Sequence, residues 1–358
     1  MTQKARSADT FRKINDFMSN SMVSVAILSV LISVLVLAVL SIIYGANPLR
    51  VITTLFQGAF NSRRAVIQTF SQMTPLILTA LAVYIPYKVG FFNVGGQGQL
   101  ELAALAAVFL GTNFQGNSFA AILLMLLVSM LVGTIVVVIP LLLKLKRGAN
   151  EVTTTIMMTF VCVNFLNAMV TGTLKDPAAF YGATRSIPRG FMLPNIPGLA
   201  GYHIGIAIAV IIALIIGWMM KNTVIGYYLR VVGQNMEAAR VAGVNVRAIT
   251  IGAVLLGGAL AGLAGGIMVT GVTSRVALGW SMTWGFTGIT IAFLGASPIT
   301  LIPIALLMAI LETGSRYMQA MTSVPAALIP IIQGVPVIAF VCLTAYKKHY
   351  LNKRKRIS

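Results

Sequence analysis

The chain has 358 residues, of which 58% are hydrophobic and 9% are charged, and its mean hydropathy is +0.92. Soluble domains carry roughly 25% charged and 45–50% apolar residues, so this composition excludes a soluble enzyme, a secreted domain and a disordered chain. It indicates a polytopic membrane protein. The net charge of +19 comes from short basic clusters between apolar runs. A nucleic-acid site needs a basic stripe instead, so we expect no nucleic-acid partner.

Ten apolar segments meet or approach the length of about 20 residues that a membrane span requires. The third, eighth and ninth are short, as broken or re-entrant helices are. The first is too long for the apolar region of a signal peptide and is expected to remain as a helix. We predict an all-α bundle of about ten transmembrane helices in one domain over residues 23–346, between an N-terminal segment 1–22 and a basic tail 347–358. The segments are 23–44, 66–86, 98–111, 119–143, 151–171, 202–220, 248–271, 281–296, 299–312 and 325–346.

The distribution of Lys and Arg predicts the orientation of the chain. If the N-terminus is cytoplasmic, 18 of the 26 basic residues fall in cytoplasmic segments and 8 fall outside. Cytoplasmic loops carry such an excess, so both termini are expected in the cytoplasm. Residues 172–201 then lie outside, and residues 221–247 form a long cytoplasmic connection.

The sequence offers no pattern typical of an enzyme or a metal site. His203 and His349 have no Cys or Glu at metal-binding spacing, and both are expected at the interface or in solvent. The chain lacks a Gly-Lys dipeptide and therefore any P-loop. We expect no cofactor and no ATPase site of its own. Glu101 is the carboxylate expected well inside a span, which is a weak basis for a proton relay.

Polar residues on helix faces are candidates for a substrate path, because amides can bond to sugar hydroxyls and purine edges. In the fifth segment Asn164 and Asn167 share a face, and in the second Gln68 and Gln72 do so. The alternative for such amides is hydrogen bonding between helices. For the aromatic candidates the alternative is a belt of aromatic side chains at the interface between membrane and water. Further candidates are Asn93, Gln97 and Gln99 in a glycine-rich break, and Trp280 and Trp284 near the eighth segment.

The cytoplasmic connection 221–247 contains a short small-faced helix, with Glu237, Ala238 and Ala239 followed by Gly243. Gly243 stands where a helix is commonly ended by a glycine at positive φ. A short helix with small residues suits insertion into a groove of a partner. The alternative is an amphipathic connector on the membrane surface. Gly258, Gly262 and Gly266 recur every four residues, which predicts a closely packed helix face.

The Glu-Ala-Ala-x-x-x-Gly segment resembles the coupling helix of ABC importer permeases. Three further stretches, 90–99, 150–158 and 258–266, resemble in order and spacing the permeases of nucleoside and simple-sugar ABC importers, relatives of the branched-chain amino-acid and ribose permeases. The resemblance covers residues from about 66 to 345. This chain has Gln97 where the family often has an acidic residue.

The resemblance implies a type II importer permease in the cell membrane of a prokaryote. It also implies a second homologous permease, two ATP-binding cassette subunits and an extracytoplasmic substrate-binding lipoprotein. Glu237, Ala238, Ala239 and Gly243 would contact an ATP-binding subunit. The expected substrate is a nucleoside, with a simple sugar as the alternative. A secondary transporter working alone and a non-transporting scaffold are the rivals from other classes.

Overall fold

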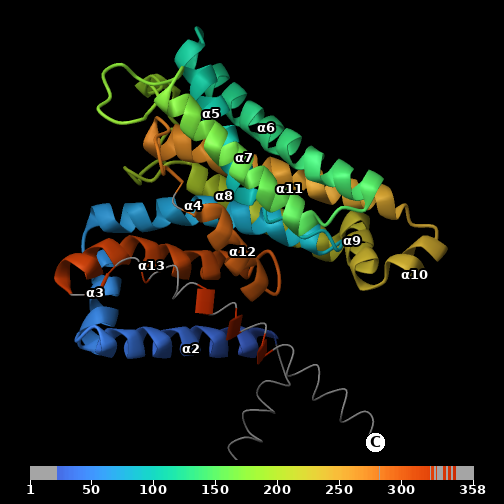
Figure 1. Ribbon diagram of the computed structural model, residues 1–358, viewed down its shortest axis with the longest axis horizontal. Helices are drawn as coiled ribbons and strands as arrows, with labels where there is room; N and C mark the ends of the chain where they lie inside the picture. The colour runs from blue at the N-terminus through green and yellow to red at the C-terminus, as the bar shows by residue number, and fades with distance from the viewer. Residues whose placement is uncertain are drawn as a thin grey trace, which may run out of the picture. The chain divides into compact units, whose positions relative to one another are not determined.

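The computed structural model of the chain describes residues 22–281 and 283–322 and a few positions between 324 and 343. These residues are almost entirely helical (Figure 1), and extended pairing among them consists of three isolated bridges. The helices are α2 (Met22–Ile43), α3 (Pro48–Phe60), α4 (Arg63–Tyr87), α5 (Gly96–Asn113), α6 (Ser118–Arg147), α7 (Glu151–Thr171), η1 (Arg189–Phe191), α8 (Gly205–Asn222), α9 (Val224–Gln234), α10 (Met236–Val241), α11 (Val246–Met268), η2 (Val269–Thr273), α12 (Trp284–Leu294) and α13 (Leu301–Met321).

The all-helical class is confirmed, but the count of about ten spans is not. In the described part of the chain, six helices are long and apolar enough to cross a membrane, or seven if the bent pair α2 and α3 is one span. The predicted segment 98–111 is the helix α5, whose first turns are polar, and the segment 281–296 contains the 11-residue helix α12. Most of the segment 325–346 lies outside the described residues, as do the first 21 residues, His349 and the tail.

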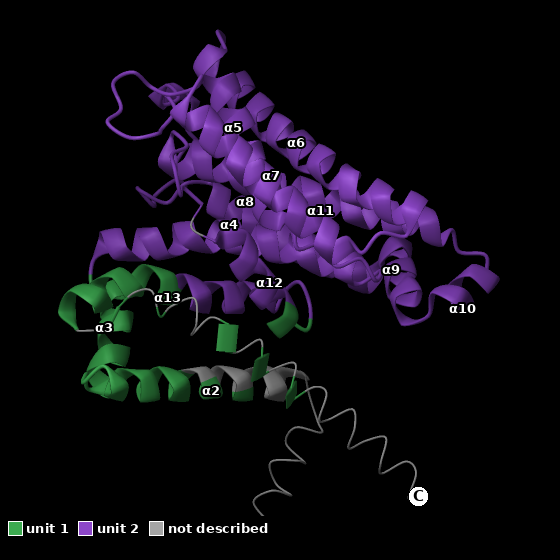
Figure 2. Ribbon diagram, viewed as in Figure 1, with its two compact units in different colours: residues 1–61, 293–296, 310–358 green, residues 62–292, 297–309 purple. Residues whose placement is uncertain are grey.

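The chain divides into two compact units, drawn in two colours in Figure 2. The first unit contains residues 1–61, 293–296 and 310–358, and the second contains residues 62–292 and 297–309. In the first unit, α2 and α3 meet at an angle of 117°. The bend is formed by Gly45 at φ +69° and by Asn47, which caps α3 before Pro48. Val51 and Leu55 of α3 pack against Met318 of α13.

Helix α11 is the centre of the second unit, because its glycines let three neighbouring helices approach closely. A Cβ atom on Gly262 would overlap the carbonyl of Ser129 in α6, and one on Gly265 would overlap that of Leu100 in α5. A Cβ on Gly257 would lie 2.7 Å from the Ala82 carbonyl in α4. The predicted glycine stripe is therefore a packing surface, as its spacing indicated.

Connections of the second unit gather at two opposite ends of its helices (Figure 1). At one end, Met236 of α10 lies against Gly90, whose carbonyl accepts a hydrogen bond from Lys144 at 3.3 Å. At the other end, the connection 172–204 contacts the start of α4, the end of α5 and the segment that follows η2. Its contacts are Arg63 with the Ala200 carbonyl, Gly111 with Ile187, and Thr184 with Val276. Helices α4, α5, α6, α7, α8 and α11 thus run alternately between the two ends.

Candidate translocation and coupling site

The polar face that the sequence predicts on α7 is accessible in this chain. Asn164 is exposed and Asn167 is half-buried, whereas Cys162 and Leu166 on the opposite face are 1% and 2% exposed. Asn150 caps the helix, since its Oδ1 accepts hydrogen bonds from the Val152 and Thr153 amides. Further residues at three- and four-residue steps along this face of α7 are also exposed: Thr153, Met157, Phe160 and Thr171.

Asn164 keeps part of its hydrogen-bonding capacity free for a ligand. Its Nδ2 donates to the carbonyl of Phe160, one turn earlier, at 2.8 Å. An amide side chain offers two donor hydrogens and one acceptor oxygen. One turn of α7 separates Asn164 from Asn167, so both amides lie along one stripe of the helix.

The amides in the glycine-rich break have partners in the protein. Asn93 and Gln99 exchange two hydrogen bonds of 3.1 Å, and both residues are almost completely buried. The Oδ1 of Asn93 also accepts from the Gly95 amide at 3.0 Å, which fixes the entry into α5. This geometry matches the alternative interpretation, hydrogen bonding within the protein, and a substrate contact by Asn93 and Gln99 stays an untested expectation.

A second buried network joins the start of α5 to the start of α12. The Nε2 of Gln97 donates to the Glu101 carboxylate at 2.8 Å, and its Oε1 accepts from the Gly285 amide at 2.7 Å. The Ser281 hydroxyl bonds to both Gln97 and Glu101. Glu101 is 8% exposed, so its carboxylate is buried in the protein, and its depth in the membrane stays a prediction. A carboxylate with these donors is held in place rather than free to relay protons.

The candidates on α4 and near α12 are divided between surface and interior. Gln68 is exposed, and Gln72 is 8% exposed with no hydrogen-bond partner for its Oε1 among the described residues. Trp284 is 2% exposed and meets Trp280 edge to face at 5.3 Å. Trp280 donates its Nε1 hydrogen to Thr273 at 3.0 Å. The two indoles form a packed pair, and a substrate contact by Trp280 and Trp284 stays a prediction.

The short cytoplasmic helix predicted from the sequence exists as α10. Asn235 begins it, accepting hydrogen bonds from the Glu237 and Ala238 amides at 3.0 Å. Gly243 follows its end at φ +80°, so the expected left-handed glycine is confirmed. Glu237 and Ala238 are exposed, and Val241 is 90% exposed. An isolated apolar side chain with that exposure, on a two-turn helix, is available to a partner.

Ala239 lies on the inner side of α10, with no exposed surface. A bulky residue there would push α10 away from its own chain instead of separating it from a partner. The inner side packs on the α4–α5 connection, because Met236 contacts Gly90 and a Cβ on Gly233 of α9 would overlap the Lys88 carbonyl. Burial lowers the pKa of the Lys88 amine. Asn93, which is buried, follows three residues after Gly90, so the segment that α10 contacts is close in sequence to the glycine-rich break.

The expectation for His203 is wrong, since its side chain is 2% exposed. The ring lies between two glycines: a Cβ on Gly205 or Gly271 would come within 2.7 Å of its Nδ1. Neither ring nitrogen has a hydrogen-bond partner among the described residues, and burial lowers the pKa of His203 from 6.5 to about 4. The apolar slot holds a neutral imidazole, which the sequence could not show because Gly205 and Gly271 are far apart in the chain.

Ser281 and Thr155 are the polar residues of the buried networks that the sequence did not single out. The Thr155 hydroxyl accepts a hydrogen bond from the Val94 amide at 3.2 Å and so ties α7 to the glycine-rich break. In the sequence, Thr155 could have been identified as a candidate because it lies four residues after Glu151, at the start of an apolar helix. Glu151 forms an ion pair of 2.6 Å with Lys144 across the α6–α7 connection.

Comparison with known proteins adds a family to this geometry. Residues 65–341 match the family described as "Branched-chain amino acid transport system / permease component". The glucose ABC transporter permease of Haloferax volcanii is 32% identical over 335 residues, which cover 90% of this chain and 88% of that protein. The guanosine ABC transporter permease of Bacillus subtilis is 29% identical, with 93% and 96% covered. The nucleoside ABC transporter permease of Lactococcus lactis is 28% identical, with 94% of each chain covered.

Proposed function

Because the chain belongs to the permease-component family of branched-chain amino acid transport systems and is an ABC transporter permease of the nucleoside and sugar type, we propose that it forms half of the translocation path of an ATP-driven importer of nucleosides. The exposed polar face of α7 carries this proposal. Asn164 and Asn167 stand on a membrane-length helix whose other face is packed. Such amides remain in a membrane where they meet water, a substrate or a partner helix.

A second permease would complete the path by covering the exposed face of α7. An amide that faces lipid lacks bonding partners, and that costs free energy. A partner chain with its own polar face would enclose a hydrated path between the two, in which amides bond to a nucleobase edge or a ribose hydroxyl.

The energy for transport would come from two ATP-binding subunits that contact α10. The exposed Ala238 and Val241 form a small apolar surface on α10. Glu237 and Arg240 of the same helix form an ion pair of 2.9 Å. An extracytoplasmic binding lipoprotein would deliver the substrate at the end of the bundle that carries residues 172–204.

A simple sugar is the second candidate substrate, and one observation favours it. The relative from Haloferax volcanii is named for glucose and is 32% identical to this chain. The relatives from Bacillus subtilis and Lactococcus lactis, named for guanosine and nucleosides, favour the nucleoside. Amides on α7 serve both substrates, so the binding lipoprotein would select between them.

Reconstitution of the complete importer tests the proposal. The chain is co-purified with its partner permease and ATP-binding subunits, placed in liposomes and supplied with binding lipoprotein and radiolabelled guanosine or glucose. We expect ATP-dependent uptake of guanosine. Uptake of glucose alone would replace the nucleoside with a sugar. Uptake by this chain alone, driven by an ion gradient and independent of ATP, would overturn the importer and establish a secondary transporter.

A further inference from the structure

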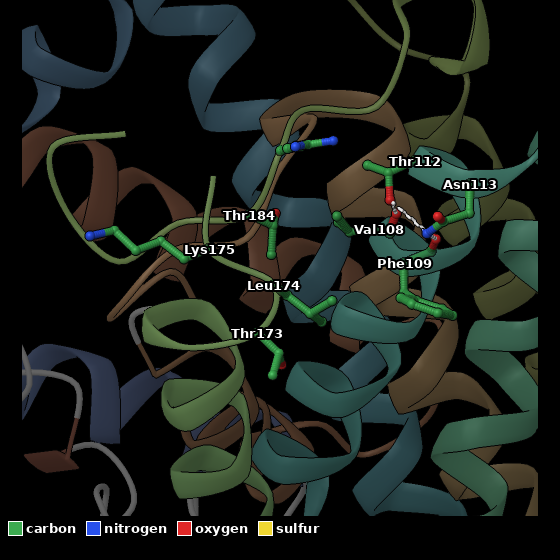
Figure 3. Close-up of a pocket in the computed structure, with 9 residues that line it drawn as sticks. Val108, Phe109, Thr112, Asn113, Thr173, Leu174, Lys175 and Thr184 are labelled. Atoms are coloured by element: carbon green, nitrogen blue, oxygen red, sulfur yellow. Dashed lines mark hydrogen bonds between the residues drawn. The ribbon is translucent and has the colours of Figure 1, made fainter. Parts of the chain in front are cut away.

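Two cavities of the second unit adjoin each other on the outer surface of α5 and α7. One has a volume of about 300 Å³ and a polar lining at the end of the two helices (Figure 3). The other has about 580 Å³ and is lined almost entirely by apolar side chains between α5, α6 and α7. They share the lining residues Phe109, Thr173 and Leu174, so they are direct neighbours, and the two cavities together are called the groove below.

The polarity of this groove changes along a single face of α5. Leu102, Leu105 and Phe109 line its apolar part, and Thr112 and Asn113 line its polar part. These residues follow three- and four-residue steps and therefore share one stripe of the helix. The axis rises about 16 Å from the first to the last of them. One leaflet of bilayer hydrocarbon is about 15 Å thick. The apolar part, from Leu102 to Phe109, rises about 10 Å along the axis and so matches the upper two thirds of an acyl chain.

The polar end of the groove carries two cations. Lys175 and Arg185 line it, and a backbone bridge between Lys175 and Thr184 joins the two segments that carry them. Both side chains are exposed, and neither has an ion pair or a side-chain hydrogen bond within the described residues. The neighbouring Asp176 does not line the cavity, and its carboxylate accepts a hydrogen bond from the Ala178 amide at 3.0 Å.

The wall opposite the cations adds neutral polar groups. Figure 3 shows Thr112 and Asn113 of α5 on the opposite side of the cavity from Lys175. The Asn113 Nδ2 donates to the Phe109 carbonyl at 2.7 Å, which orients the amide at the rim. An anion at this end would meet two positive charges, which attract an anionic headgroup.

We propose that this groove is a binding site for an anionic phospholipid, whose phosphate lies between Lys175 and Arg185 and whose acyl chain lies along α5 between α6 and α7. Charge complementarity and the change from apolar to cationic lining identify the occupant. A helix of a partner protein would match the apolar part but leave two cations unpaired. A free phosphate would match the cations but leave the apolar groove empty.

Native mass spectrometry of the delipidated chain, alone and in complex with its partner permease, tests the site. The probes are phosphatidylglycerol and phosphatidylcholine with identical acyl chains. We expect one phosphatidylglycerol to be retained in preference to phosphatidylcholine. The double variant Lys175→Gln, Arg185→Gln should weaken its retention about fivefold for each charge removed. Ala106→Trp, which fills the apolar part, should also weaken it. Arg189→Gln and Ala207→Trp are the matched controls outside the groove.

Each other result contradicts the proposal. Equal retention of both lipids, or unchanged retention by the double charge variant, shows that Lys175 and Arg185 do not bind an anionic headgroup. Competition by inorganic phosphate that persists in Ala106→Trp indicates a site for a free anion. Loss of the partner permease from the complex of Ala106→Trp, with phosphatidylglycerol still bound, assigns the groove to a protein interface. If Ala106→Trp does not fold, as judged by size-exclusion chromatography, the charge variant decides.

Discussion

The amides of the second unit differ in what surrounds them, and this difference separates structural from functional candidates. Asn93 and Gln99 are buried and satisfy each other. Asn164 is exposed and bonds only within its own helix turn, as far as the described residues show. Removing a buried partner leaves an unsatisfied group, which costs about 1–3 kcal/mol. Removing an exposed amide costs little stability and affects only what binds there.

Replacing both path amides should therefore impair transport without destabilising the protein. We expect Asn164→Leu, Asn167→Leu to reduce ATP-dependent uptake at least tenfold, since two hydrogen-bonding groups contribute about 1 kcal/mol or more each. The thermal midpoint in detergent should stay within about 2 °C of the parent. Uptake in proteoliposomes and a melting curve measure the two effects.

The matched control is Gln99→Leu, which removes a buried amide of the same kind. It should lower the midpoint, because the Asn93 side chain loses two hydrogen bonds. If the α7 double variant transports normally, neither amide belongs to the path. If it melts as early as Gln99→Leu, its amides contribute to folding instead.

The burial of His203 predicts a loss of stability in mild acid. Its pKa is about 4 in the folded protein and 6.5 unperturbed, so below pH 6.5 the unfolded chain binds the proton more readily. Between pH 7.5 and pH 5 this difference should destabilise the fold by about 2 kcal/mol. The His203→Gln variant should lack this part of the pH dependence. Equal shifts of the melting midpoint in parent and variant would show that the imidazole is not buried as a neutral group.

At the residue scale, the sequence could identify polar groups but not their partners. The Asn93–Gln99 pair spans six residues and was within reach of a local argument. The Gln97–Ser281 contact joins positions 184 residues apart, and it depends on how α12 packs against α5. Helical spacing predicted that the polar residues of α7 share one face of the helix. It did not show which face of α7 packs against the rest of the protein.

Helix α11 has the clearest relation between sequence and packing. Its glycines at four-residue spacing face α6, where the Ser129 carbonyl leaves no room for a side chain. Gly262→Val should force the two helices apart and destabilise the protein by about 3 kcal/mol. Gly252→Val is the matched control on the same helix, because a Cβ there meets no atom within 4 Å.

The readout for this pair is the yield of monodisperse protein and its melting midpoint. Gly252→Val should equal the parent or slightly exceed it, since Val has a higher helix propensity than Gly. Comparable behaviour of the two variants would mean that α11 and α6 are not in backbone contact.

Helix α10 can be tested through its outward side without disturbing its inward side. Ala238 is exposed whereas Ala239 is buried, so Ala238→Trp adds bulk only where a partner would lie. We expect it to abolish ATP-driven uptake while the melting midpoint is unchanged. Ala248→Trp, an exposed alanine just after α10, is the control that should transport normally. Normal uptake by Ala238→Trp would make α10 a connector and remove the proposed contact with the ATP-binding subunit.

At the scale of elements, long apolar runs of the sequence predicted membrane-length helices correctly, whereas short apolar runs did not. The segments that became α4, α6, α7, α8 and α11 shift by a few residues at their ends. Helix α3 was missed, because its apolar residues alternate with Arg50 and Gln57, and the run is too short for a span. Helix α13 extends to Met321, beyond the predicted end at 312, because Glu312 and Arg316 interrupted the apolar pattern without breaking the helix.

At the scale of the whole molecule, the contacts of the second unit sort its connections into two groups. The α4–α5 connection meets α10 and the last turn of α6 at one end, and the 172–204 connection meets the 269–278 segment at the other. The Lys and Arg count assigns the same two groups to opposite sides of the membrane. Packing thus supports the division of the connections into two groups. The charge bias predicts which group faces the cytoplasm, and packing alone does not determine this.

Labelling of single cysteines in intact cells determines that direction. Cys162 and Cys342 are free thiols and are first replaced by alanine. We then expect Phe180→Cys to react with an impermeant maleimide from outside, and Val241→Cys to react only after the membrane is permeabilised. Both positions are at least 90% exposed in the chain, so accessibility of the thiol is not limiting. The reverse pattern would place α10 outside, where ATP-binding subunits cannot reach it, and would overturn both the orientation and the proposed coupling contact. Labelling of both positions from outside would show that residues 180 and 241 share a side, which is incompatible with the alternating path of the helices between them.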